Sequence, residues 1–112
     1  MLFHLDFHVE YGATMSQQDL FSTWSREAEA ALGAKKAGVV VDLWKVAGER
    51  RVIAIVDVDS HDALDEISLT LPIMVEMGQF ITINVSALRR YEDFAGSVNR
   101  LLQDADVAPG GS

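Results

Sequence analysis

Two adjacent arginines, Arg50 and Arg51, follow Gly48 in a predicted turn near the middle of the chain. The planar guanidinium group of arginine donates a fork of hydrogen bonds that matches both oxygens of a carboxylate. On a protein with a formal net charge of −8, these arginines would form a local basic site that admits an anionic ligand. The alternative is a charged hairpin tip that prevents pairing of strand edges. The pattern leaves both interpretations open.

Glu27 is the candidate for acid–base chemistry. It lies in a helix predicted over residues 16–35, at the flank of an apolar stripe that includes Leu20 and Trp24. A carboxylate at the edge of an apolar surface loses part of its hydration, which raises its pKa and suits it to proton transfer. The alternative is a solvated carboxylate that pairs with Arg26.

His4, Asp6 and His8 alternate along the first predicted strand and share one face of it. Neighbours on that face are roughly 6.6 Å apart, so two adjacent members could chelate one ion, while His4 and His8 span about twice that distance. No second histidine cluster supplies further ligands. We therefore expect no metal ion, and we interpret the two histidines as pocket or interface residues.

The bulk composition excludes several classes of function. The acidic net charge argues against nucleic-acid binding, and the absence of cysteine excludes disulfides and thiolate chemistry. No apolar run approaches the roughly 18 residues of a membrane span, and no signal peptide is recognisable. We expect a soluble cytoplasmic protein with no nucleic-acid or membrane partner.

The order of predicted elements is β-α-β-β-α-β, followed by one more helix. Strict alternation predicts a strand over residues 2–11, with Phe3, Leu5, Phe7 and Val9 on one face, and helical periodicity predicts helices after Ser16, after Asp59 or Ser60, and after Leu88. This order is typical of an α+β ferredoxin-like fold with an antiparallel sheet, of the dimeric α+β barrel type. Residues 1–88 would form the domain, residues 89–106 a C-terminal helix that contacts another subunit or caps a pocket, and residues 107–112 a flexible tail.

In this fold the helices cover one face of the sheet and leave the other to a ligand or a second subunit. The open face would carry His4, His8, Trp44, Arg51 and Phe80. We therefore predict a mixed polar and aromatic pocket for a small organic acid on that face. The alternative is a wet dimer interface rich in ion pairs.

Four short segments resemble the muconolactone isomerase family: "MLFH" at 1–4, "LWKVAG" at 43–48, "VDVDSHDALDEI" at 56–67 and "LP" at 71–72. The resemblance implies a ferredoxin-like domain in a homo-oligomer. It also implies movement of a double bond within an unsaturated lactone acid, in catechol breakdown through the β-ketoadipate route. No cofactor or metal would be needed, and Glu27 matches the position of a helix-one glutamate that we assign as the proton shuttle. Arg50 or Arg51 would hold the substrate carboxylate, and His4, His8 or Trp44 would line the pocket.

The chain departs from the family pattern at ligand-facing positions. Arg50 and Val52 stand where the family commonly has Tyr and Asn, and the segment after Leu71 lacks the family's second proline and its aromatics. Two alternatives to the family reaction follow. One is a non-catalytic small-molecule-binding or assembly protein of the same fold, and the other is a related dehalogenase that eliminates halide after the same proton abstraction.

Overall fold

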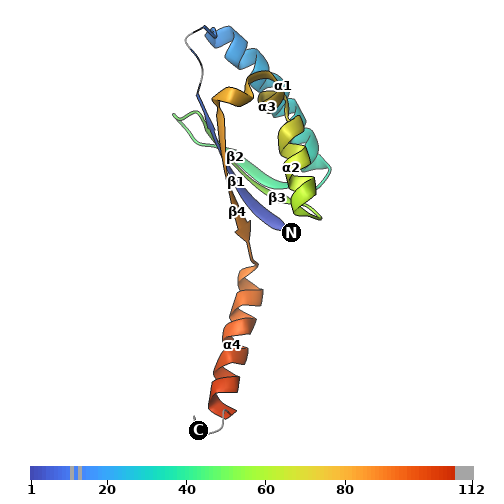
Figure 1. Ribbon diagram of the computed structural model, residues 1–112, viewed down its shortest axis with the longest axis vertical. Coiled ribbons are helices and arrows are strands. Elements are labelled where there is room, and N and C mark those ends of the chain that lie inside the picture. The colour runs from blue at the N-terminus through green and yellow to red at the C-terminus, as the bar shows by residue number, and fades with distance from the viewer. Residues whose placement is uncertain (11, 13, 108–112) are drawn as a thin grey trace.

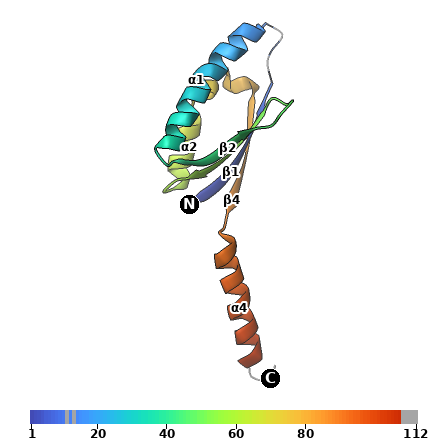
Figure 2. The ribbon, with the colours of Figure 1, turned by 180° about the vertical axis from the view of Figure 1, so that it is seen from behind.

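The computed structural model describes residues 1–10, 12 and 14–107. Four strands form one antiparallel sheet in the order β2-β3-β1-β4, with β1 (Leu2–Val9) in its interior. The other strands are β2 (Val40–Lys45), β3 (Arg51–Asp57) and β4 (Ile81–Leu88). The helices α1 (Gln17–Lys36) and α2 (His61–Thr70) lie on one face of this sheet (Figures 1 and 2). The predicted α+β ferredoxin-like fold is confirmed.

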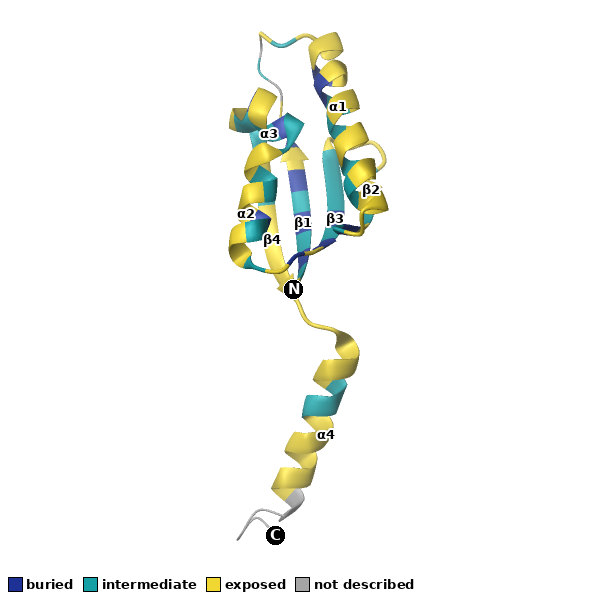
Figure 3. Cartoon of the chain, turned by 90° about the vertical axis from the view of Figure 1, so that its right-hand side faces the viewer, coloured by how far each residue is buried: buried dark blue, intermediate teal, exposed yellow. Residues whose placement is uncertain are grey.

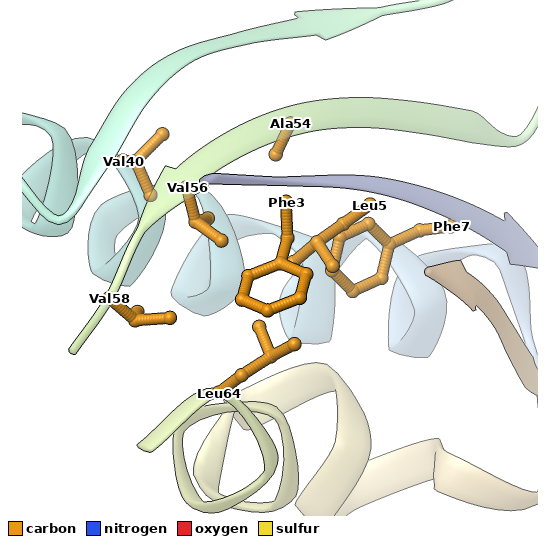
Figure 4. Packing of buried hydrophobic residues seen from close by; sticks show 8 residues of the cluster. All are labelled: Phe3, Leu5, Phe7, Val40, Ala54, Val56, Val58 and Leu64. Carbon is orange, nitrogen blue, oxygen red and sulfur yellow. The ribbon is translucent and has the colours of Figure 1, made fainter. Parts of the chain in front are cut away.

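The core lies between the sheet and α2. Phe3, Leu5 and Phe7 point from β1 toward Leu64 of α2, and Val56 adjoins them from β3 (Figure 4). Alternation along β1 causes this arrangement, because every second side chain points to the same face. A second cluster joins Val9, Leu20, Ile73 and Met77 and anchors the start of α1.

The helix starts follow local capping rules. The Ser16 side chain accepts a hydrogen bond from the Asp19 amide at 3.0 Å, and the Asp19 carboxylate accepts one from the Ser16 amide, which completes a capping box. Of the two predicted caps for α2, Ser60 is the one used, since its hydroxyl accepts from the Ala63 amide at 3.0 Å. Both caps were recognisable in the sequence.

The segment between α2 and β4 differs from the prediction. Pro72 ends α2, as expected, but it also opens a further helix, α3 (Pro72–Met77), followed by the 3-10 helix η1 (Gly78–Phe80). Proline suits the first turn of a helix, because its fixed φ is helical and its missing N–H needs no partner there. The expected place of Phe80 on the open face is wrong. The helix η1 includes Phe80, so that β4 begins only at Ile81, and Phe80 packs against the cluster that contains Val9.

The C-terminal helix α4 (Tyr91–Val107) extends away from the domain, and its side chains from residue 91 to 105 are exposed or only partly covered (Figure 3). It reaches residue 107, where the tail was expected to begin, and residues 108–112 of that tail lie outside the described residues. Among the described residues, no helix has the length and apolar composition needed to cross a bilayer.

Gly48 is expected to be required at the tip of the β2–β3 hairpin. Its φ is +80°, a conformation that a Cβ disfavours, although nothing lies within 4 Å to clash with an added methyl group. We expect Gly48→Ala to lower the free energy of unfolding by about 1 kcal/mol. Gly33→Ala, in α1 and equally uncrowded, is the matched control and should raise it by roughly 0.5–1 kcal/mol. Urea unfolding of both variants checks this, and changes of equal sign would contradict the conformational explanation.

Candidate active site

A cavity of about 1260 Å³ lies between α1 and the helix-covered face of the sheet. Its volume is somewhat above the range usual for small-molecule sites, which is roughly 300–1,000 Å³. Apolar side chains of the sheet and of α1 supply most of the wall, among them Leu5, Phe7, Leu43, Ala54, Trp24 and Ala31. The sequence predicts a pocket on the open face of the sheet, whereas this cavity lies on the opposite face, which the helices cover.

The cavity exists because α1 is not packed closely on the sheet. Only Leu20 and Thr23 of this helix are buried, and after Glu27 the residues that line the cavity are small alanines. Phe21 and Leu32, which helical spacing also places in the apolar stripe, are 58% and 61% exposed. The stripe therefore faces the cavity and open solvent and not a close-packed layer.

Glu27 lies in the wall of this cavity. Burial raises the pKa of its carboxyl group, and a hydrogen bond from the Ile73 amide to Oε2, at 3.1 Å, opposes part of that rise. The contact occurs at the first turn of α3, where the N-cap residue Leu71 supplies no side-chain hydrogen bond. The Glu27 carboxylate thus satisfies an amide that the helix itself leaves without a partner.

A second polar contact ties α1 to α3 beside Glu27. Arg26 Nε donates to Glu76 Oε2 at 2.9 Å, and Arg26 Nη2 donates to the other oxygen of the same carboxylate. This bidentate contact holds the pKa of Glu76 below its usual value. The alternative interpretation, in which Arg26 pairs with Glu27, is therefore wrong, and the Glu27 carboxylate is directed to α3 and the cavity.

The two adjacent arginines both border the cavity at the hairpin end, but Arg51 lies opposite His8 in the strand register and so belongs to the open face. Arg51 donates from Nε and Nη2 to the two carboxylate oxygens of Asp6, at 2.9 and 2.7 Å. That contact, on the open face, is the main reason why the pKa of Asp6 lies below its usual value.

The remaining predicted ligand residues also lie on the open face. The strand register places His4 opposite Ile55, His8 opposite Arg51 and Trp44 opposite Ile53. His8 Nε2 lies 3.3 Å from Asp6 Oδ1, and half of the Trp44 surface is exposed. His8, Trp44 and Arg51 reach the edge of the cavity near the hairpin, whereas His4 does not border it.

The H-x-D-x-H segment has an ion pair at its centre. The Asp6 carboxylate is bound by Arg51 on both oxygens. Within the described ranges, no group of three or more His, Asp or Glu side chains is placed to hold a metal ion.

Lys45 is a cavity residue that sequence analysis missed. Its Nζ lies 5.9 Å from the centroid of the Trp24 ring and donates to the Val46 carbonyl at 2.9 Å. A register shift between Val40 and Asp42 inserts one extra residue into β2. This bulge changes which residues face the helices. The segment "LWK" contained this information, because neighbouring residues of a strand point to opposite faces of the sheet. If Trp44 lies on the open face, Lys45 lies on the face that the helices cover.

The fold and the cavity define an α+β ferredoxin-like domain with a partly desolvated carboxylic acid in an apolar wall. The model of the family "Muconolactone delta-isomerase" matches residues 1–93, and the chain belongs to this family. The resemblance carried by the four short segments is thereby confirmed. The match ends within the first turn of α4.

Among solved structures, the crystal structure of a muconolactone isomerase resembles this chain with a TM-score of 0.68 and 28% identity, covering 80% of this chain and 90% of that one. A hypothetical protein from Pyrococcus horikoshii gives 15% identity, 81% and 95% coverage and a TM-score of 0.42. A protein from Agrobacterium tumefaciens gives 12% identity, 81% and 96% coverage and a TM-score of 0.40. These last two are too dissimilar to support an argument. No curated protein gives a significant sequence match.

Replacing Glu27 by Gln is expected to raise stability at neutral pH. Burial raises the pKa of Glu27 in the folded state above its value in the unfolded chain, about 4.3. Below that unfolded value, the protonated carboxyl group contributes its full stabilisation. This stabilisation is lost as the pH rises through the folded-state pKa. Glutamine cannot ionise, and its amide oxygen can still accept from the Ile73 amide. Thermal unfolding at pH 7 should show a rise in Tm of less than about 4 °C, and the difference should shrink toward pH 4.

Glu29→Gln is the matched control for this measurement, because Glu29 lies on the same helix and is exposed. Its effect on Tm should be small at both pH values. A loss of stability in Glu27→Gln at pH 7 would mean that the hydrogen bond to Ile73 outweighs the cost of burying the charge.

Proposed function

We propose that this protein is a cofactor-independent isomerase that moves a double bond within a small unsaturated lactone acid, with Glu27 as the proton shuttle. The observation that carries the proposal is the position of Glu27, a carboxyl group with a raised pKa in the wall of a large apolar cavity. Membership of the muconolactone delta-isomerase family supports the choice of substrate class.

The reaction needs one base that becomes an acid. The Glu27 carboxylate removes a proton from a carbon next to the conjugated lactone, and the C–H electron pair moves into a dienolate whose charge rests on the carbonyl oxygen. The neutral carboxyl group then returns the proton to a different carbon, so that one C–H bond breaks, another forms and no electrons are gained or lost. A raised pKa lies closer to the working pH, so that Glu27 can both accept and donate a proton. This favours both steps of the reaction.

Two cations at the cavity support the negative charges. We assign Arg50 to the substrate carboxylate and Lys45 to the developing dienolate oxygen, since both border the same cavity as Glu27. Fixed charges at the place where negative charge develops lower the barrier most in a site that excludes water. Arg51, which binds Asp6 and borders the same cavity at its edge, is the alternative partner for the substrate carboxylate.

The open face of the sheet has a separate role in this proposal. His4, His8, Trp44 and the Asp6–Arg51 pair would be covered by a second copy of the chain in a homo-oligomer. The mixture of an ion pair, histidines and a half-exposed tryptophan suits a subunit contact with a polar rim. Of these residues, His8, Trp44 and Arg51 would then reach a ligand only at the hairpin edge of the cavity.

Incubation of the protein with muconolactone in deuterated water tests the reaction, with NMR following deuterium entry and double-bond position. We expect both to change with the native protein and to slow by at least about 100-fold in Glu27→Gln. Glu29→Gln, which changes the same charge at an exposed position of α1, should act as the native protein does.

The outcomes of this experiment distinguish the alternatives. Deuterium exchange without isomerisation would keep Glu27 as a base and point to a different lactone. Ligand binding with no exchange would contradict an isomerase and favour the non-catalytic binding protein. A near-normal rate in Glu27→Gln would remove this residue from the acid–base role.

Lys45→Met is expected to slow turnover while retaining the apolar stem that lies near Trp24. Loss of a charged hydrogen-bond donor is worth about 1.5–3 kcal/mol, so kcat/KM should fall by roughly 10- to 150-fold. Lys36→Met, at the exposed end of α1, is the control and should leave kcat/KM unchanged. An equal effect in both variants would reflect the change in net charge and not a site contact.

A further inference from the structure

The helix α4 has a strong apolar stripe and no neighbour to cover it. Tyr91 and Leu101 are 75% and 68% exposed, and the helix projects clear of the sheet and of α1–α3 (Figures 1 and 3). A single helix of this length is only marginally stable in water, and Gly96 lowers its helix propensity further. The helix therefore needs a partner, and the described part of the chain does not supply one.

The stripe has the spacing of a helix pair. Its members follow one another at intervals of three, four, three and four residues, at positions Tyr91, Phe94, Val98, Leu101 and Ala105. This heptad repeat is the pattern by which two helices interlock side chains along a shared seam. The same spacing suits a helix that rests on a sheet, so the charges beside the stripe decide between the two occupants.

The charges beside the stripe select the direction of pairing. Ser97 and Asp104 lie seven residues apart along one flank of the seam, and Arg90 continues this spacing at the start of α4, where its carbonyl accepts from the Asp93 and Phe94 amides. In an antiparallel pair this flank faces the same flank of the other helix. With Ser97 opposite Ser97, Arg90 of each copy lies opposite Asp104 of the other, because the two are equally far from Ser97. A parallel pair would instead place Arg90 near Ala95 and leave Asp104 without a counter-charge.

The antiparallel register also fits the apolar residues. It pairs Tyr91 with Leu101 and Phe94 with Val98 across the seam. One register thus accounts for both the stripe and the flanking charges.

We propose that α4 pairs antiparallel with α4 of a second copy of this chain, about a two-fold axis beside Ser97. A surface that is complementary to itself is what a two-fold contact between identical chains requires. The family match ends at residue 93, so this contact belongs to an element beyond the matched family domain. It is independent of the cavity and of the proposed isomerase reaction.

Crosslinking of the full chain tests the pairing directly, because the protein contains no cysteine. Ser97→Cys puts one thiol on each side of the proposed axis, and a short bis-maleimide should join two chains. Asn99→Cys, on the opposite side of α4, is the matched control. We expect dimer formation to be at least about tenfold faster at Ser97, because pairing raises the effective concentration of the two thiols.

Exchange of charges tests the register. In the Ser97→Cys background, Arg90→Asp alone and Asp104→Arg alone each set like charges opposite one another, and each should slow crosslinking by about tenfold. The double variant restores opposite charges and should restore the rate. Leu101→Asp, in the seam, should abolish fast crosslinking, whereas Asn99→Asp should not.

Several results would overturn the proposal. Equal crosslinking at Ser97 and Asn99 would show that no fixed pair forms. Failure of the double charge variant to recover would exclude the antiparallel register. If Leu101→Asp changed ligand affinity but left crosslinking intact, α4 would be a cover for the cavity and not a pairing element.

Discussion

The hydrogen bond from the Ile73 amide to the Glu27 carboxylate joins α1 to α3 at the wall of the cavity. The helix α1 buries only Leu20 and Thr23, so few of its side chains are held by apolar packing. The pair between Arg26 and Glu76 adds a second polar contact between the same two helices. Glu27 therefore both ties α1 to α3 and lies in the cavity wall.

The sheet separates two kinds of surface. Alternation along β1 sends Phe3, Leu5 and Phe7 toward the helices and keeps Asp6 on the open face. The Asp6 carboxylate then binds Arg51 on that face, and Arg51 reaches the cavity at its hairpin edge. Arg50, one residue earlier, lies in the hairpin turn and also borders the cavity. The strand register thus decides that Arg51, opposite His8, shares a face with Asp6.

Features governed by neighbours in the sequence could be predicted, and features governed by tertiary packing could not. The caps at Ser16 and Ser60 and the two faces of β1 follow from short-range rules. The roof of the cavity does not, because the apolar stripe of α1 looks the same whether it meets a packed sheet or a hollow. The β2 bulge was hidden because apolar residues occupy both faces of that strand, and it places Val40, opposite Val56, on the same face as Leu43 and Lys45.

The separation of α4 from the cavity has an energetic consequence. Substitutions at sites well over 7–10 Å apart that share no partners contribute additively to stability. α4 lies apart from Glu27 and from the α1–α3 contact (Figure 1). The helix can therefore strengthen or weaken association between copies without altering the desolvation that raises the pKa of Glu27. In the proposed pairing, an extension attached through the end of β4 would add an interface while the domain before it keeps its own cavity.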